Sequence, residues 1–231
     1  MHHLEVSAFT KILMDQVQIV ALLFMATMYV LKVRWLLSFP AGKERTPARG
    51  DHDKAIRYAY LTLAMPWELE STRKQWPRYL EFVFFHIGAA VCILTTFILP
   101  YWPQLLAGSA TILVLRVIIT LAFLSGLVRM VRRLARPHMR AISSPDDYFS
   151  MILLNFWLVT AFFAVGQTSE PWLIAFFGTT TFFLIYVPFS KISHYLLWPF
   201  IRYYQGKHFG HRGVYPKKMV ANNGLRQTLS A

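Results

Sequence analysis

The stretch from Trp172 to Ser190 contains nineteen consecutive residues without a charged side chain. A helix rises about 1.5 Å per residue, so it needs about 20 mainly apolar residues to cross a hydrocarbon core of about 30 Å. The stretch therefore predicts a membrane-spanning helix. The span is expected to end near Lys191, which leaves His194 close to the membrane boundary.

Four further apolar runs have a similar length, and 55% of the 231 residues are hydrophobic. This composition excludes a soluble globular domain and predicts an all-α integral membrane protein with five transmembrane helices. No small-residue cleavage site follows the first run, so we interpret it as a retained helix and not as a signal peptide. We expect one membrane domain over residues 1–231, with spans at about 16–39, 79–99, 105–130, 148–165 and 172–191.

The 24 Lys and Arg residues are concentrated in alternate connections. Ten lie between Lys32 and Arg78, five between Arg129 and Arg140, and seven from Lys191 to Arg226. Short cytoplasmic loops carry such an excess of positive charge. The pattern predicts an outer N-terminus, an inner C-terminus, inner loops at 40–78 and 131–147, and an inner tail at 205–231. Topology thus explains the net charge of +13, and nucleic acid is not a predicted partner.

The first inner loop contains one predicted helix, which Asp51 or Asp53 would cap. Its apolar positions at helical spacing are Ala55, Tyr58, Leu61 and Met65. Such a helix could lie amphipathically on the membrane surface or pack as an ordinary loop helix, and the sequence leaves both open.

The second inner loop ends in the sequence SSPDD, residues 143–147, which predicts a helix start with serine as the cap and proline in the first turn. The fourth span would begin there. After the fifth span, the tail from Gln205 is rich in Gly, Lys and Asn and is expected to be a solvated segment suited to docking on another protein.

Two histidines lie in apolar surroundings, His86 in the second predicted span and His194 at the end of the fifth. Because these two spans run in opposite directions, we expect both imidazoles at a comparable depth near the inner side. Two neutral imidazoles facing each other across a bundle can ligate one haem iron, and Gly88, Ala89 and Ala90 would leave room for the macrocycle. Alternatively, each histidine is an ordinary hydrogen-bonded residue of the bundle.

Two other residues limit the chemistry. Arg116 is expected near the middle of the third span, where it would face the bundle interior and meet an anion such as a propionate or a carboxylate. Cys92 is the single cysteine, so the chain holds no internal disulfide and no Cys-ligated iron–sulfur cluster. Any such cluster would belong to a partner, and the lack of a CxxCH sequence excludes a covalent haem c.

Three segments carry a family resemblance: Phe85–Gly88, Arg132–Leu154 and Pro188–His194. They resemble the gamma subunit of respiratory nitrate reductase and the related membrane cytochrome b subunits of heterodisulfide-reductase-like and sulfite-reductase-linked quinone complexes. The fold of that family has five transmembrane helices, an outer N-terminus and an inner C-terminus. The resemblance implies that His86 and His194 are the axial ligands of an inner haem b.

The nitrate reductase type also has an outer haem, whose ligands would fall at Thr96 and near Phe176 in this chain. Neither position holds a histidine. The resemblance therefore implies one haem b and favours the heterodisulfide-reductase-like, sulfite-reductase-linked branch.

By this resemblance the chain is the membrane subunit of a quinone/quinol oxidoreductase complex in the cytoplasmic membrane. It would relay electrons between menaquinone or ubiquinone and a cytoplasmic iron–sulfur or catalytic subunit docked on the basic inner loops and tail. Arg116 and Lys191 would be contacts for a haem propionate or the quinone, and membrane lipid would surround the spans.

Two other classes of function stay open at this point. In a proton or anion transporter or channel subunit, His86, Arg116 and His194 would line the path. Broken helices or internal repeats would favour that class, and the sequence shows neither. In a purely structural anchor without a cofactor, substituting either histidine would change little.

Overall fold

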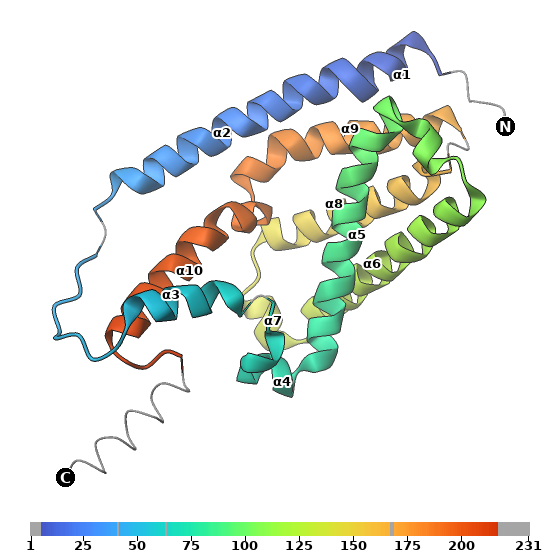
Figure 1. Cartoon of the computed structure of the whole chain (residues 1–231). Coiled ribbons are helices and arrows are strands. Elements are labelled where there is room, and N and C mark those ends of the chain that lie inside the picture. The colour runs from blue at the N-terminus through green and yellow to red at the C-terminus, as the bar shows by residue number, and fades with distance from the viewer. Residues whose placement is uncertain (1–5, 41, 63, 167–168, 217–231) are drawn as a thin grey trace. The chain divides into compact units, whose positions relative to one another are not determined.

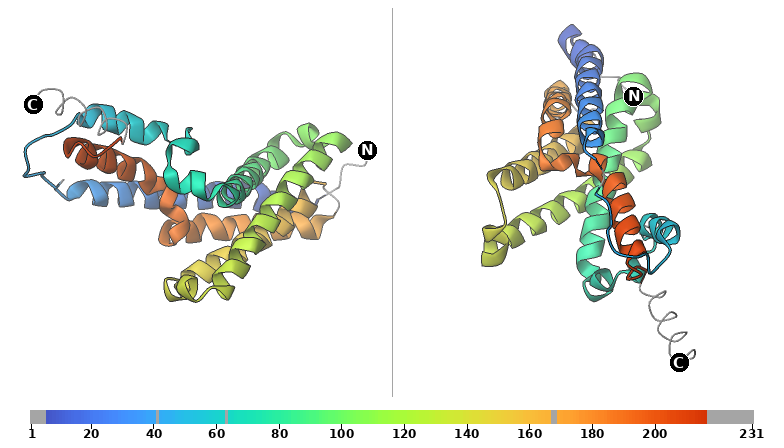
Figure 2. Two further views of the ribbon diagram at one scale, coloured as in Figure 1. Left: turned by 90° about the horizontal axis from the view of Figure 1, so that it is seen from below. Right: turned by 90° about the vertical axis from the view of Figure 1, so that its left-hand side faces the viewer.

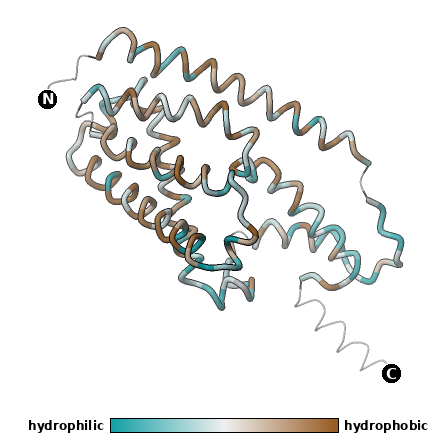
Figure 3. The backbone as a smooth tube through the Cα atoms, turned by 180° about the vertical axis from the view of Figure 1, so that it is seen from behind, coloured by the Kyte–Doolittle hydropathy of each residue, from teal (hydrophilic) through white to brown (hydrophobic). Residues whose placement is uncertain are grey.

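The computed structural model describes residues 6–40, 42–62, 64–166 and 169–216. Every regular element within these residues is a helix (Figure 1). Five helices are long and apolar enough to span a membrane, which agrees with the predicted number of spans. Hydrophilic residues gather in the connection that follows the first of them (Figure 3). The five candidate spans are Ala8–Ser38, Trp76–Tyr101, Ser109–Ala135, Pro145–Ala164 and Glu170–Phe189.

The chain divides into two compact units. Unit 1 consists of Met1–Lys32 and Pro77–Ile192 and contains most of the apolar helices. Unit 2 consists of Val33–Trp76 and Ser193–Ala231, so it combines an early and a late part of the sequence.

The first helix of unit 1 begins at Ala8, earlier than the predicted start at residue 16. It consists of α1 (Ala8–Ile12), a π-helical turn (Leu13–Val17) and α2 (Gln18–Ser38). Ser7 caps it by accepting a hydrogen bond from the amide of Thr10. The Ser7 amide and the Thr10 hydroxyl also donate to the carboxylate of Glu170, at the start of α9 (Glu170–Tyr186). This contact with a distant residue secures the early start.

The interior of unit 1 lies between α6 (Ser109–Ala135), α8 (Pro145–Ala164) and α9. α8 packs on both of the other helices, and all of the views in Figure 2 are consistent with this. Trp157 is almost fully buried there, donates a hydrogen bond to the Thr180 hydroxyl at 2.8 Å and stacks on Phe176. Close packing and hydrogen bonds between helices are what hold helices together inside a membrane.

Helix α5 (Trp76–Tyr101) meets α6 at a glycine. A Cβ atom on Gly88 would lie 2.1 Å from the Cβ of Ala122, so only glycine allows the helices to approach this closely. Toward the C-terminal end of α5, the buried face continues with Cys92, Thr95 and Leu99. Cys92, which is fully buried, therefore packs as a small hydrophobic residue.

The predicted start of the fourth span is confirmed in detail. Ser144 is the N-cap of α8, Pro145 occupies the first turn, and Ser144 and Asp147 form a reciprocal capping box. In such a box the cap and the third helical residue each satisfy a backbone amide that the helix leaves open.

Unit 2 is built on α3 (His52–Leu61) and α10 (His194–His211), which lie side by side (Figures 1 and 2). The predicted loop helix is confirmed, and Asp51 is its cap, since its carboxylate accepts from the Lys54 amide at 3.0 Å. Ala55 and Ala59 are fully buried, so α3 is a packed helix. Beyond it follow a short 3-10 turn (Pro66–Glu68) and α4 (Glu70–Lys74).

The contact between α3 and α10 depends on two glycines one helical turn apart. A Cβ on Gly206 would lie 2.4 Å from the Cα of Ile56, and a Cβ on Gly210 would lie 2.4 Å from the Cβ of Ala55. The expectation of a solvated tail from Gln205 is therefore wrong for residues 205–211, which complete α10. The rest of that predicted tail from residue 217 onward lies outside the described residues.

Polar contacts close the same unit. Glu44 accepts from Arg212 at 3.1 Å and lies 3.5 Å from His208. Desolvation opposes ionisation of Glu44, but these hydrogen bonds outweigh it and lower the pKa of the carboxyl below its ordinary value. Burial, reinforced by a 2.8 Å hydrogen bond to Glu68, raises the pKa of Tyr58 to about 12.

Candidate functional site

His86 lies in the apolar part of α5 and is half-buried. Its Nδ1 is 2.8 Å from the carbonyl oxygen of Phe82, and its ring centroid is 3.9 Å from that of Phe82. A carbonyl oxygen can only accept, so Nδ1 is the donor in this contact, and in the neutral imidazole the lone pair then lies on Nε2. Histidines that bind a metal are commonly oriented in this way by a backbone carbonyl.

The direction of Gly88 differs from the expectation. His86 lies ten residues after the start of α5 at Trp76, about 15 Å along the helix. Gly88 is about 200° further around the helix, where it faces Ala122 of α6. The expectation that Gly88 leaves room for a macrocycle is therefore wrong, because α6 occupies that space.

His194 is the first residue of α10 and is exposed. The fifth candidate span ends at Phe189, slightly before the predicted residue 191. Two 3-10 turns, Val187–Phe189 and Lys191–Ser193, separate α9 from α10, and Pro188 in the first turn cannot supply a helical amide. His194 therefore belongs to unit 2, whereas His86 belongs to unit 1.

Arg116 lies seven residues after the start of α6, about 10 Å from that end, and not in the middle of the helix. Its Nε donates to the carbonyl oxygen of Phe162 at 3.2 Å, and its guanidinium lies 5.1 Å from the centre of the Phe162 ring. Within the described ranges no carboxylate forms an ion pair with Arg116. A carbonyl and a ring take the place of the expected anion.

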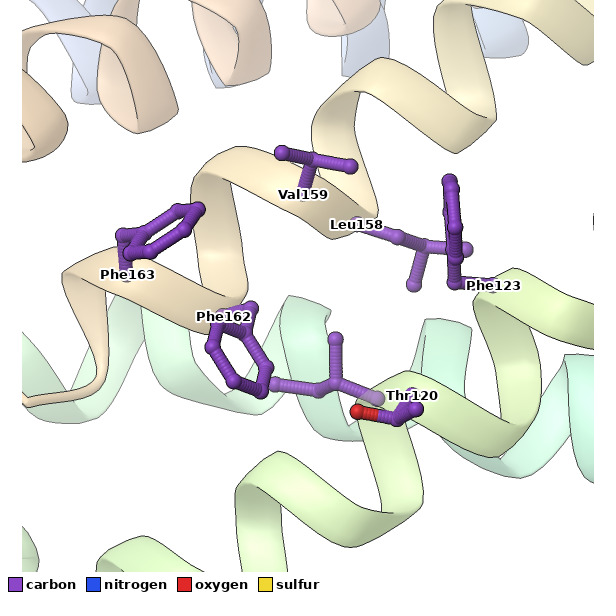
Figure 4. A pocket seen from close by; sticks show the side chains of 7 residues that line it. Thr120, Phe123, Leu158, Val159, Phe162 and Phe163 are labelled. Carbon is purple, nitrogen blue, oxygen red and sulfur yellow. The ribbon is translucent and has the colours of Figure 1, made fainter.

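An apolar cavity of about 100 Å³ lies beside Phe162, between α6 and α8 (Figure 4). Its walls include Thr120 and Phe123 from α6 and Leu158 and Phe163 from α8. It offers hardly any polar group to a ligand and is too small for a cofactor. We assign no site to it.

Lys191 joins the end of the fifth span to the start of the fourth. Its Nζ donates to Asp147 at 2.6 Å and to the Ser144 hydroxyl at 2.8 Å. Its backbone amide donates to Asp146 at 3.1 Å, and Arg133 lies 3.6 Å from Asp147. A propionate or quinone contact at Lys191 would therefore compete with an existing ion pair.

The sequence analysis missed a second charged cluster, centred on Glu81 of α5. Arg132 donates two hydrogen bonds to its carboxylate, at 2.6 and 2.9 Å, and Arg129 lies 3.6 Å away. The Glu81 side chain is only 13% exposed. The sequence does show a single acidic residue at the start of the second apolar run and several arginines at the end of the third. Their pairing could not be predicted, because it depends on which helices are neighbours.

In the part of the chain that the structure describes, no group of three or more His, Cys, Asp or Glu could hold a metal ion. A site with two histidine ligands lies below that size. The imidazole of His86, with its second nitrogen fixed by a carbonyl, fits the donor chemistry that haem iron requires.

Comparison with known proteins shows a similarity over part of the chain. A 152-residue segment is 30% identical to a protein of Nitratidesulfovibrio vulgaris (strain Hildenborough) described simply as "Protein". The match covers 59% of this chain and 63% of the relative, so the chain spans less than two thirds of that relative. No protein-family model and no solved structure matches the chain.

Proposed function

We propose that the chain is the haem b membrane subunit of a quinone-linked respiratory complex, with His86 and His194 as the axial ligands. The observation that carries the proposal is the imidazole of His86, held inside an apolar helix with Nδ1–H donated to Phe82. Bound haem b would supply one-electron transfer, which a two-electron quinol and an iron–sulfur partner both require. The resemblance at Pro188–His194 adds His194 as the second ligand.

The break between α9 and α10 supports a special role for His194. An unbroken helix through Pro188 would be costly, since proline removes a hydrogen bond and clashes with the preceding turn. The short turns end the span and place His194, which is exposed, at the first residue of α10.

Arg116 and Lys191 remain candidates for contact with a propionate or with menaquinone or ubiquinone. Arg116 has one nitrogen bonded to the Phe162 carbonyl, and its guanidinium carries further donors. Lys191 already pairs with Asp147, so we give Arg116 the stronger claim.

The charge of unit 2 supports a partner on the same side of the membrane. Fourteen Lys and Arg residues against five Asp and Glu give it a net charge of +9, out of +13 for the chain. By the positive-inside rule we place this unit and the C-terminus in the cytoplasm, with the N-terminus outside the cytoplasmic membrane. A partner with an acidic surface, such as an iron–sulfur subunit, would dock there with electrostatic attraction.

A haem assay on the purified full chain tests this proposal. We expect a b-type reduced-minus-oxidised spectrum and about one haem per chain by pyridine haemochrome in the wild type. His86→Ala and His194→Ala should each lose the haem or its six-coordinate spectrum. His138→Ala is the matched control, because His138 is an exposed histidine on α7 (Pro137–Ala141), outside the candidate spans.

Added imidazole provides a second readout. If the ring of His86 serves mainly as a ligand, imidazole should restore the six-coordinate spectrum of His86→Ala, while far-UV circular dichroism shows unchanged helix content. A wild type without haem, or both variants with a normal spectrum, would refute the proposal. The transporter and the cofactor-free anchor would then become the leading functions.

A further inference from the structure

A groove of about 720 Å³ in unit 1 combines two kinds of wall. It lies between the first turn of α5 and the last turns of α6. Leu124, Val128 and Val131 form an apolar strip along α6, and they are 50%, 55% and 62% exposed. Arginines line the other end of the groove, namely Arg78, Arg132 and Arg136.

The length of the groove corresponds to one leaflet of a bilayer. Leu124 and Arg136 are twelve residues apart, which is about 18 Å along a helix. Half of a hydrocarbon core is about 15 Å thick. The apolar strip therefore has the depth of an acyl chain, and the arginines come at the level of the head groups.

At this end of the unit, arginines outnumber carboxylates even among the residues that form ion pairs. Arg129 and Arg132 share the single carboxylate of Glu81. One carboxylate therefore faces two guanidinium groups at this end of the unit. Arginine also carries five N–H donors and binds phosphate oxygens in a bidentate manner, so a guanidinium with one partner can hold another.

We propose that this groove is a binding site for an anionic phospholipid. Its phosphate lies against Arg78 and Arg136, and one acyl chain lies along Leu124, Val128 and Val131. Basic pockets between transmembrane helices bind anionic head groups in this manner. Free phosphate would gain nothing from the apolar strip, and a soluble acidic protein could not follow it into the membrane. The inference goes beyond the proposed electron transfer and requires no haem.

Native mass spectrometry of the detergent-solubilised full chain tests the site. The probes are phosphatidylglycerol and phosphatidylcholine with the same acyl chains. We expect the wild type to prefer phosphatidylglycerol. Each arginine near a membrane surface contributes about a five-fold factor to binding of an anionic lipid. Arg136→Gln should therefore weaken phosphatidylglycerol binding about five-fold, and Arg78→Gln with Arg136→Gln about twenty-five-fold, with phosphatidylcholine binding unchanged.

Two further variants separate this site from general attraction. Arg140→Gln removes the same charge from α7, outside the groove, and should change binding less than two-fold. Val128→Trp fills the apolar strip without changing a charge and should also weaken phosphatidylglycerol binding. Gel filtration and far-UV circular dichroism verify that each variant is folded.

Several outcomes would overturn the inference. Equal binding of the two lipids, or equal losses in Arg136→Gln and Arg140→Gln, would mean that the lipid surrounds the protein without a specific site. Displacement of the lipid by inorganic phosphate at constant ionic strength, with Val128→Trp behaving as wild type, would mean a simple anion site. The lipid assay does not depend on haem. A chain without haem would therefore refute the proposed function without affecting the test of the lipid site.

Discussion

Replacing Glu81 by glutamine should destabilise unit 1 by about 2 kcal/mol. The change keeps the size of the side chain but removes the charge that Arg132 and Arg129 share. Breaking a fully buried ion pair costs about 3–5 kcal/mol, and an exposed pair contributes about 0–1 kcal/mol. Glu81 is 13% exposed, but Arg132 and Arg129 are 24% and 36% exposed and can turn toward water or lipid phosphate. The loss should therefore lie between these limits.

The measurement is equilibrium unfolding of the full chain in mixed detergent–SDS micelles, followed by far-UV circular dichroism. Glu70→Gln is the matched control, since its pair with Lys74 is one turn apart on the same helix and is exposed. Such a pair contributes about 0.2–0.5 kcal/mol. A double-mutant cycle with Arg132→Gln then isolates the interaction of Glu81 with that residue.

Either of two results would contradict the predicted destabilisation. One is a loss for Glu81→Gln no larger than that for Glu70→Gln. The other is a coupling energy near zero between positions 81 and 132, which would show that the two hydrogen bonds contribute no net stability. An apolar replacement of both partners that leaves stability unchanged would not count against it, because such swaps are often neutral.

Two more predictions concern unit 2. Gly206→Ala should lower the stability of unit 2 by about 1–3 kcal/mol despite the better helix propensity of alanine, because its Cβ would meet the backbone of Ile56. Gly178→Ala in α9, where a Cβ meets nothing within 4 Å, should be neutral or stabilising in the same unfolding assay. The lowered pKa of Glu44 means that its ionised form is favoured in the folded state, so its contribution is complete above the ordinary value near 4.5 and is lost as the pH falls through the lowered value. Melting temperatures between pH 6 and pH 3 should therefore fall less steeply for Glu44→Gln than for wild type, and parallel curves would contradict this.

Local signals in the sequence were sufficient for much of the fold. The apolar runs indicated the five candidate spans, and the sequence of residues 143–147 indicated the capping box of Ser144. The helix capped by Asp51 also follows from spacing and a suitable cap. In each case the residues that determine the structure are near neighbours in the chain.

The missed features depend on partners that are distant in sequence. The early start at Ala8 rests on Glu170, and the role of Gly88 rests on Ala122. Similarly, Glu81 and Arg132 pair only because α5 and α6 are neighbours. Periodicity and charge cannot identify such pairs, because they do not say which helix faces meet.

The local structure at His194 also differs from the expectation. The uncharged run ends at Lys191, so the sequence indicated a span that ends there and leaves His194 close to the membrane boundary. In the structure the span ends at Phe189, two short turns follow, and His194 begins the new helix α10. His86, in contrast, lies within its predicted helix.

The glycine-mediated pairing of α3 with α10 has a consequence for biosynthesis. The ribosome makes α3 early, but all of α5, α6, α8 and α9 must be synthesised before α10 appears. Until then the buried faces of Ala55 and Ala59 have no helix to cover them. Domains generally fold as they emerge, but unit 2 has to wait until these four helices have been made. A chain interrupted before α10 would therefore expose an apolar helix face that quality-control proteases can recognise.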